Sequence, residues 1–387
     1  MQDASLNVVV AKLSKQFSAG KTRLLGPLGV VLATKLLIAC GVYLLATRNG
    51  AQFHTFWVDE WGISKPDWPL LFHGWDSAWY IRIAKTGYSY PAYAFLPAYP
   101  FMIKIAYLLI GDWILSSFIV SFLLGVAAVP MFQLLAENYM SKDQAAIVTL
   151  VFALFPPVFF FTSIAYTESL FLVATIGTWL FCLRKKWFPS TILATVASLT
   201  KIYGILIVLP LALRLVKEGR KRTALLAVLA SLTTLLGWGY YLLTLSGDPL
   251  AFWSSQNHWR EGWPYGVSSV LRAVVESASN TGSASALTVS WILIVALWIV
   301  IITLTGISVV KSMEVDEEFG LYGMMLFAFL AAFGNVWSFS RFLSFILPAW
   351  LTLRTVSKAA LTAAIATFPI ISLVIWYLFV IPGAWIG

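Results

Sequence analysis

Long apolar runs without charged residues are the feature that most limits the folds open to this sequence. The run from Leu287 to Val310 contains no charged side chain, and a membrane-spanning helix needs about 20 largely apolar residues. Of the 387 residues, 60% are hydrophobic and 11% charged, whereas soluble proteins carry roughly 25% charged residues. An outer-membrane barrel is disfavoured because its strands alternate over about ten residues. The sequence therefore predicts an all-α, polytopic helical membrane protein with roughly nine to twelve transmembrane helices.

The apolar segments place the expected helices along the chain. We expect helices at about 26–47, 94–110, 114–136, 145–162, 168–183, 223–245, 287–310, 319–336, 342–353 and 359–381. The segment between Trp187 and Leu213 has basic clusters at both ends, which places both ends in the cytoplasm, yet it is too short for two crossings. Two half-helices broken at residues 200–204 resolve this conflict, because a break at membrane depth is tolerated where it lines a cavity.

The distribution of basic residues indicates how the chain is oriented in the membrane rather than a binding site for a charged ligand. The net charge of +9 comes from 26 Lys and Arg against 17 Asp and Glu. The basic residues gather in short clusters between apolar runs, at 12–23, 184–186, 214–222 and 354–358. Dispersed clusters of this kind are typical of the positive-inside rule, so the bilayer is the expected partner and nucleic acid is not.

The charge pattern also sets the expected domain organisation. We predict a single integral membrane domain over residues 1–387, with a cytoplasmic N-terminus at 1–25. Two long external loops are expected, at 48–93 and 246–286. The first is rich in tryptophan, which favours the membrane interface, so we expect it to be structured.

The densest group of chemically active residues lies at 74–84 in the first external loop. If residues 77–85 form a helix, Asp76 lies at its start and Tyr80 one turn later. The side chains of Trp75, Trp79 and Arg82 then share another stripe. A helix cap and interface anchoring would explain these residues structurally. A carboxylate among aromatic rings at the membrane surface nevertheless favours a functional site.

This segment resembles a known family. The pattern Trp-Asp-x-x-Trp-Tyr-x-x-Ile-Ala-x-x-Gly-Tyr from Trp75, followed by Ala-Phe-x-Pro-x-Tyr-Pro from Ala94, resembles the first-loop signature of the PIG-V-like mannosyltransferases. That family comprises GPI mannosyltransferase II and its prokaryotic relatives. Further matching blocks lie at 155–157 with 166–169, 200–204, 248–252 with 258–260, and 340–342. The chain departs from the family pattern at Leu96, Ala98 and Lys201.

The resemblance implies a fold, an activity and a base. It implies a GT-C glycosyltransferase that moves a sugar, mannose, from a polyprenyl-phosphate donor to a glycan or glycolipid acceptor at the external membrane face. It also implies an inverting single displacement, in which a carboxylate takes the proton of the acceptor hydroxyl. Asp76 is the expected base, and the acidic pair Asp59 and Glu60 is the alternative.

The remaining expected site residues are cations and aromatic side chains. A lipid phosphate leaving group needs cationic donors, for which the candidates are Lys201, Arg341, Arg260 and His258. Lys201 and Arg341 interrupt apolar stretches, where an ionisable residue indicates function. Snorkelling of Lys201, helix-end anchoring by Arg341 and a surface pair between Arg260 and Glu261 remain alternatives. The expected substrate contacts are Trp75, Trp79, Tyr80, Arg82, Tyr88, Tyr99 and Glu168.

The sequence is compatible with three roles for Glu168. It could bind acceptor hydroxyls, pair with a basic donor residue, or simply begin a helix, where the dipole favours an acidic side chain.

No metal or other cofactor is expected, because the three histidines show no tight metal-ligand spacing with cysteine or acidic residues. A transporter or flippase for lipid-linked or small polar substrates is the main alternative function, since half-helices and membrane-depth cations suit it as well. The sequence has no Asn-x-Ser/Thr sequon, which favours a prokaryotic plasma membrane. The endoplasmic reticulum is the expected location if the source is eukaryotic.

Overall fold

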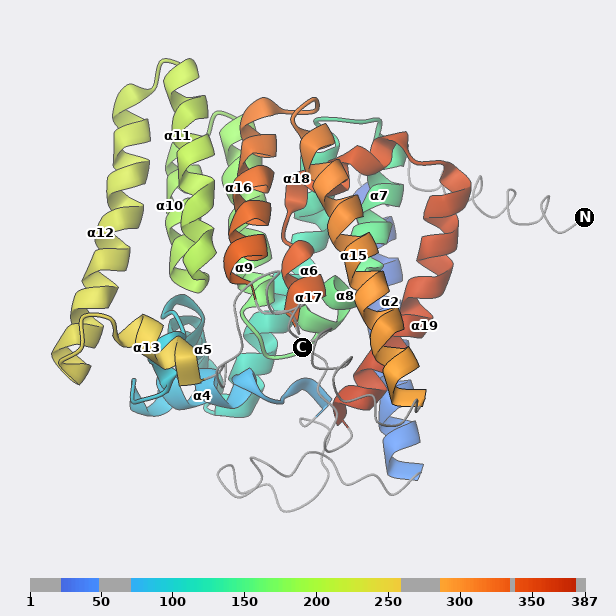
Figure 1. The fold of residues 1–387 in the computed structure, drawn as a ribbon, viewed down its shortest axis with the longest axis horizontal. Coiled ribbons are helices and arrows are strands. Elements are labelled where there is room, and N and C mark those ends of the chain that lie inside the picture. The colour runs from blue at the N-terminus through green and yellow to red at the C-terminus, as the bar shows by residue number, and fades with distance from the viewer. Residues whose placement is uncertain (1–21, 49–70, 259–285, 335–337, 381–387) are drawn as a thin grey trace, which may run out of the picture. The chain divides into compact units, whose positions relative to one another are not determined.

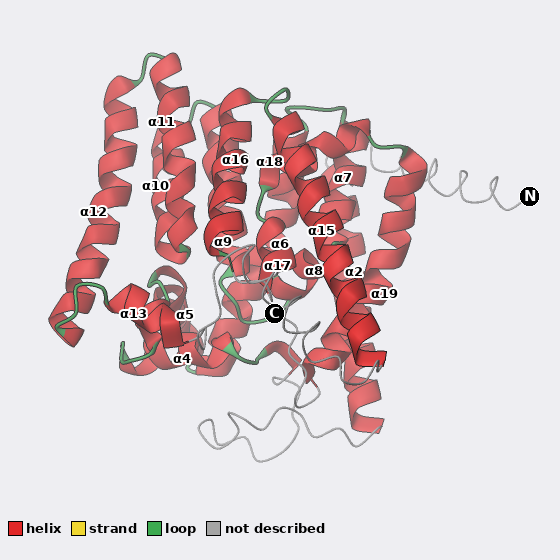
Figure 2. Cartoon of the chain, in the orientation of Figure 1, coloured by secondary structure: helices red, strands yellow, loops and turns green. Residues whose placement is uncertain are grey.

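The computed structural model describes residues 22–48, 71–258, 286–334 and 338–380. Every regular element among these residues is a helix (Figures 1 and 2), which confirms the all-α prediction. The chain divides into two compact units. Unit 1 comprises Met1–Thr86, Ala98–Leu193 and Leu353–Trp385. Unit 2 comprises Gly87–Pro97, Ala194–Thr352 and Ile386–Gly387.

Unit 1 is a helical bundle centred on one long apolar helix. Its helices are α2 (Thr22–Arg48), α4 (Asp76–Thr86), α5 (Ala98–Ile110), α6 (Trp113–Ala136), α7 (Lys142–Leu154), α8 (Pro156–Phe161), α9 (Glu168–Leu183), the first part of α10 (Trp187–Thr200), and α19 (Lys358–Val380). Helix α6 packs against α2, α5, α7 and α9. The core between them holds large buried side chains such as Phe132, Phe152 and Phe171. The short helix α4 packs on α5 and α6, so the core of unit 1 supports the segment that carries Asp76.

Unit 2 contains the second half of α10 and the elements that follow it. These are η4 (Ile202–Ile207), α11 (Val208–Lys217), α12 (Lys221–Ser246), α13 (Ala251–His258), α15 (Ala286–Ser312), α16 (Glu317–Phe333), α17 (Phe339–Leu343) and α18 (Leu347–Leu351), together with η3 (Ala92–Ala94). In Figure 1, α11 and α12 lie side by side, joined by a short turn. Helix α16 packs against α11, α15 and α18. The last element, η6 (Thr352–Thr355), returns the chain to unit 1.

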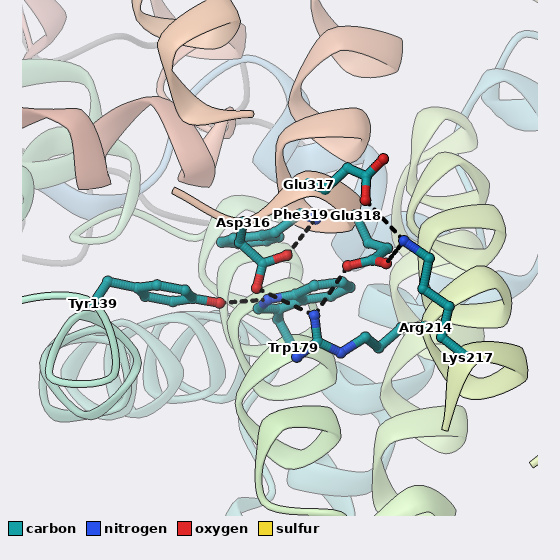
Figure 3. A network of polar contacts seen from close by, with 8 residues as sticks. All are labelled: Tyr139, Trp179, Arg214, Lys217, Asp316, Glu317, Glu318 and Phe319. Atoms are coloured by element: carbon teal, nitrogen blue, oxygen red, sulfur yellow. Dashed lines mark hydrogen bonds and ion pairs between the residues drawn. The ribbon is translucent and has the colours of Figure 1, made fainter. Parts of the chain in front are cut away.

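A cluster of charged side chains holds α11 to α16 within unit 2 (Figure 3). Arg214 lies 2.9 Å from the carboxylate of Glu318, and the Lys217 ammonium lies 2.6 Å from the same carboxylate. Lys217 also reaches Glu317 at 2.8 Å. Asp316 caps α16 by accepting a hydrogen bond from the backbone N–H of Phe319 at 3.0 Å. Acidic residues at this helix start are also favoured by the helix dipole. Figure 3 also shows the hydrogen bond within unit 1 from the Trp179 indole to the Tyr139 hydroxyl.

The predicted break at residues 200–204 is confirmed. Helix α10 ends at Thr200, Lys201 is extended with φ −143° and ψ 138°, and η4 begins at Ile202.

Three other helix predictions need correction. The helix expected at 145–162 is split into α7 and α8 at Phe155, whose ψ of 125° is extended. Proline at the next position disfavours the helical region for Phe155, which explains the break.

The other two corrections also lie beside prolines. The helix expected at 342–353 is divided into α17, α18 and η6, and the chain leaves helical geometry at Ile346, with ψ 70°. Pro348 then occupies the first turn of α18, where its missing N–H costs nothing. The helix expected at 94–110 begins only at Ala98, because Phe95 is extended (ψ 135°) and Pro97 follows two residues later.

Four helices among the described residues are long and apolar enough to cross a membrane: α2, α6, α12 and α19. Several of their large apolar side chains are exposed, including Leu37 on α2 and Leu236 on α12. Such surfaces suit contact with lipid and support the membrane-protein class. The count of nine to twelve crossings, the single domain and the loop boundaries remain predictions. Residues 1–21, 49–70 and 259–285 lie outside the described residues.

Candidate active site

Asp76 is the first residue of α4 and follows a sharp turn of the backbone. Trp75 has φ 44°, in the left-handed region that a bulky residue rarely adopts. The turn is closed by a hydrogen bond from the backbone N–H of Ser77 to the carbonyl of Gly74 at 3.0 Å. Backbone strain of this kind costs on the order of 1–3 kcal/mol and persists only where neighbouring contacts hold it. The turn leaves Asp76 partly exposed at the start of the helix.

The loop between α8 and α9, residues 162–167, supplies those neighbouring contacts. The backbone N–H of Asp76 donates to the Tyr166 hydroxyl at 3.1 Å. The backbone N–H of Ala165 donates to the carbonyl of Phe72 at 2.8 Å. Tyr166 is itself held by α6, because its backbone N–H donates to the Ser121 hydroxyl at 3.1 Å and its carbonyl accepts from that hydroxyl at 2.8 Å. The segment before α4 is thereby fixed to the middle of the bundle.

Tyr80 lies within the electrostatic reach of two carboxylates. Its ring makes edge contacts with Tyr99 and Tyr166, at centroid distances of 5.1 and 6.0 Å. Burial, together with the charges of Asp76 and Glu168, raises the pKa of the Tyr80 hydroxyl well above its ordinary value. The phenol therefore keeps its proton at physiological pH and can donate a hydrogen bond. Glu168 begins α9 and is only 1% exposed.

A second layer of polar residues lies behind Tyr80. The Tyr99 hydroxyl donates to the Ser117 carbonyl at 2.9 Å and lies 2.7 Å from the Ser121 hydroxyl. His73 Nε2 lies 2.8 Å from the Ser117 hydroxyl. Tyr99 is fully buried, so its side chain supports Tyr80 and Ser121 from inside the bundle.

Trp79 and Arg82 share a face of α4, as the helical spacing predicts. The guanidinium carbon of Arg82 lies 5.4 Å from the centre of the Trp79 ring. Arg82 is exposed and Trp79 is half-buried. Both side chains are accessible to a molecule that approaches this face of α4.

In unit 2 the structure brings Lys201 and Arg341 to the same aromatic ring. The Lys201 ammonium lies 6.0, 5.9 and 5.6 Å from the ring centres of Tyr203, Phe342 and Phe345. The guanidinium carbon of Arg341 lies 4.8 Å from the Phe342 ring centre. Aromatic faces attract cations over these distances. The arrangement collects two positive charges from elements 140 positions apart in sequence, counted from 201 to 341.

The other predicted residues of unit 2 lie around η3. The Tyr88 hydroxyl donates to the carbonyl of Phe95 at 3.0 Å, so it closes this loop. His258 ends α13, is exposed, and makes an edge contact with the Tyr90 ring at 5.6 Å. Gln256 on the same helix donates to the carbonyl of Ala94 at 3.0 Å. Arg260 and the alternative acidic pair, Asp59 and Glu60, lie outside the described residues.

Two groups of contacts escaped the sequence analysis. Tyr166 and Thr167 fall in a block that resembles the family, but nothing in their spacing assigns them to Asp76 and Tyr80. Lys35 is a buried cation in an apolar helix, and the rule that singled out Lys201 would have found it. Within the described part of the chain, no three His, Cys, Asp or Glu side chains are arranged to hold a metal ion.

Comparison with solved structures defines the class of fold. The chain is similar to ArnT from Cupriavidus metallidurans, in a crystal structure bound to undecaprenyl phosphate and in one of the apo state. The TM-scores are 0.52 and 0.51, at 15% identity in both cases. The matches cover 91% and 86% of this chain but only 64% and 61% of the ArnT chains. ArnT is a GT-C glycosyltransferase, so the chain has the predicted GT-C fold.

The family comparison is more particular. Residues 63–218 match the family model described as mannosyltransferase (PIG-V). This match confirms, over those residues, the resemblance found in the sequence. No curated protein sequence matches the chain.

Proposed function

We propose that this protein is a glycosyltransferase that moves a mannosyl residue from a polyprenyl-phosphate donor to a glycan or glycolipid acceptor. The observation that carries the proposal is the position of Asp76. It is the first residue of α4, and its backbone N–H donates a hydrogen bond to the Tyr166 hydroxyl. Asp76, Tyr166, Glu168 and Lys201 all lie within residues 63–218, which match the mannosyltransferase family. The GT-C fold and the undecaprenyl phosphate bound by ArnT support a lipid-linked donor.

In the proposed reaction Asp76 acts as the general base. The acceptor hydroxyl oxygen attacks the anomeric carbon of the donor sugar while the Asp76 carboxylate takes the hydroxyl proton. The bond between the anomeric carbon and the phosphate oxygen breaks, and the lipid phosphate leaves with the electron pair. One displacement of this kind inverts the anomeric configuration. A β-linked donor therefore yields an α-mannoside.

Lys201 and Arg341 are proposed to bind the donor phosphate. Their charges offset the negative charge that develops on the phosphate oxygens as the bond breaks. Lys201 is half-buried and its ammonium lies within 6.0 Å of three ring centres. A charge beside apolar rings interacts more strongly with a phosphate than one in bulk water does. Arg260 and His258 are proposed as further donor contacts. Trp79, Arg82 and Glu168 are proposed to contact the sugar or the acceptor.

The proposed setting is the external face of a prokaryotic plasma membrane, or the lumenal face of the endoplasmic reticulum in a eukaryote. Purified full-length protein in lipid nanodiscs, incubated with polyprenyl-phosphate sugars and a glycan or glycolipid acceptor, tests the proposal. We expect release of polyprenyl phosphate matched by mannose transfer, with an α-linkage detected by NMR. Movement of a lipid-linked substrate across sealed vesicles with no sugar released would instead favour the transporter alternative.

A further inference from the structure

We propose that Lys35 on α2 is a positioning residue for the transfer reaction, because its buried ammonium fixes the loop at residues 162–167 that holds Asp76. This inference rests on the proposed function for its kinetic consequences. Lys35 lies in the middle of a long apolar helix and is only 5% exposed. A charge in such a place is costly unless it is well coordinated, and it is rarely retained without a role.

Three oxygens of unit 1 surround the Lys35 ammonium. Its Nζ donates to the carbonyl of Phe159 at 3.0 Å, to Thr162 Oγ1 at 2.9 Å and to Ser163 Oγ at 2.5 Å. An ammonium has three N–H donors and no acceptor. All three of its protons therefore have a partner at the junction of α8 and the 162–167 loop.

The hydroxyl partners are oriented to receive the lysine. Thr162 Oγ1 donates to the carbonyl of Val158 at 2.6 Å, and Ser163 Oγ donates to that of Phe159 at 2.6 Å. Because their own protons point back into α8, the lone pairs of both hydroxyls are left for Lys35. The last turn of α8 and the first residues of the loop are thereby attached to α2.

Helix α6 confines the same loop from another direction. A Cβ atom on Gly125 would lie 2.6 Å from the carbonyl oxygen of Thr162 and 3.1 Å from Ser169 Oγ. Glycine therefore allows the loop to lie directly on the backbone of α6. Thr162 therefore lies between this glycine and the Lys35 ammonium, and it cannot move closer to α6.

The far end of the loop contacts the segment that ends in Asp76. Ala165 donates to the Phe72 carbonyl, and the Tyr166 hydroxyl accepts from the backbone N–H of Asp76. Only two residues separate Ser163 from Tyr166. Loss of the Lys35 contacts should therefore misplace Tyr166 and, through it, the Asp76 carboxylate. Misplacement of a reacting group by about 1 Å can cost about a hundredfold in rate.

The kinetic test compares Lys35→Met with Lys104→Met. Lys104 is an exposed lysine in the apolar helix α5 and provides the matched control. Per molecule of folded protein, we expect Lys35→Met to lower kcat about ten- to hundredfold and to leave the donor KM within about twofold. Lys104→Met should leave both unchanged. Normal kcat for folded Lys35→Met, with only its yield reduced, would show that Lys35 serves folding alone and would overturn the inference.

A double-mutant cycle tests the route through Tyr166. In the Tyr166→Phe background the bond to Asp76 is already lost, so adding Lys35→Met should lower kcat by less than about twofold further. If the two substitutions instead lower kcat independently, so that their fold-effects multiply, Lys35 does not act through Tyr166. If Lys35→Met does not fold, Thr162→Val removes one ammonium partner at constant shape and should lower kcat in the same direction through the same route.

Hydrogen exchange separates this inference from the proposed function, because it needs no substrate. We expect Lys35→Met to speed amide exchange at residues 162–168 and 72–77 but not within α7. Unchanged exchange in both segments would overturn the positioning role whatever the enzyme does. Faster exchange, together with a wild-type protein that transfers no sugar, would instead refute the proposed function.

Discussion

Asp76 and Glu168 both lie near Tyr80, but they differ in how a substrate can reach them. Glu168 is 1% exposed, whereas Asp76 is partly exposed at the start of α4. A general base must come within hydrogen-bonding reach of the proton that it removes. Asp76 meets this requirement without rearrangement of the bundle. Glu168 is better suited to hold Tyr80 and Thr167 in place, since Thr167 Oγ1 donates to it at 3.3 Å.

At this residue we predict that Asp76→Asn abolishes transfer. The asparagine side chain has nearly the same shape as aspartate and leaves the hydrogen bond from the backbone N–H to Tyr166 intact. Its amide, however, cannot accept the proton of the acceptor hydroxyl. Loss of a general base costs about 10²- to 10⁴-fold in rate. The measurement is initial transfer rate with saturating donor, alongside donor binding and thermal unfolding, which should both stay near wild type. A nearly active Asp76→Asn protein beside an inactive Asp59→Asn protein would move the base to the acidic pair.

A second prediction concerns Lys201 as a donor-phosphate ligand. Lys201→Arg should retain substantial activity, because guanidinium also donates to phosphate. Lys201→Met keeps the apolar stem and removes the charge, so it should lose activity by about 10²-fold and also weaken donor binding. Both variants are compared by donor titration and by turnover. Normal affinity and rate in the Met variant would eliminate the phosphate role and favour snorkelling.

At the scale of elements, the three corrected helices all differ from the expected ones beside a proline. Apolar periodicity predicted α6 and α9 within about one residue at each end, since each is a continuous apolar helix. It merged α7 with α8 and α17 with α18, because hydropathy is continuous through Phe155 and Ile346, where the backbone leaves helical geometry. The break at Lys201 was predictable for another reason. Basic clusters on both sides of this segment place both of its ends in the cytoplasm, yet the segment is too short for two crossings.

The turn after Lys201 depends on the absence of a side chain at Gly204. A Cβ atom there would overlap the carbonyl oxygen of Ala197, so η4 could not fold back on the end of α10. We predict that Gly204→Ala destabilises the protein by about 1–3 kcal/mol, as overpacking does. Thermal unfolding in detergent measures the effect. Gly237→Ala on α12 is the control, because its Cβ meets nothing within 4 Å and should leave stability unchanged or higher. Equal unfolding temperatures for the two variants would refute the close-packing explanation.

The charged cluster between α11 and α16 gives a pH-dependent prediction. Burial acts to raise the pKa of Glu318, but hydrogen bonds from Lys217 and Arg214 outweigh it and hold this pKa below its ordinary 4.5. Because the folded pKa is depressed, the cluster stabilises the fold above pH 4.5 and loses that contribution as pH falls further. The Glu317 and Glu318 carboxylates raise the pKa of Lys217 from 10.5 to about 12, so its contribution is present below pH 10.5 and is lost as the pH rises through about 12.

Comparing Glu318→Gln with wild type tests this cluster. The unfolding temperature of the variant should be lower between about pH 5 and pH 10, where all partners are charged, and the difference should shrink below pH 4.5. Glu314→Gln provides a control from the loop before α16. A difference that is constant with pH would show that the carboxylate charge contributes nothing to the fold.

For the whole molecule, each unit carries its own part of the proposed chemistry. Unit 1 holds the acidic and phenolic residues around Asp76, and unit 2 holds the cations around Phe342. The sequence singles out Asp76 by its motif, and Lys201 and Arg341 as cations that interrupt apolar stretches, and their roles remain predictions. It could not predict the contacts of Tyr166 and Lys35, whose partners lie 90 and 124 to 128 positions away. Those contacts are made by the packing of the bundle, which periodicity does not specify.

The two cations beside Phe342 lead us to predict that transfer needs no divalent metal ion. A monophosphate leaving group carries at most two negative charges, and Lys201 and Arg341 together offer two positive ones. Activity should therefore stay within about twofold of its starting value after EDTA treatment and removal of the chelated ions. Initial rates before and after chelation measure this. Strong inhibition that Mg²⁺ or Mn²⁺ reverses, and that other salts do not, would instead make some of the acidic loop residues metal ligands. The Lys201→Met variant sharpens the comparison: if the cations replace a metal ion, added Mg²⁺ should restore part of its lost rate while leaving the wild-type rate unchanged.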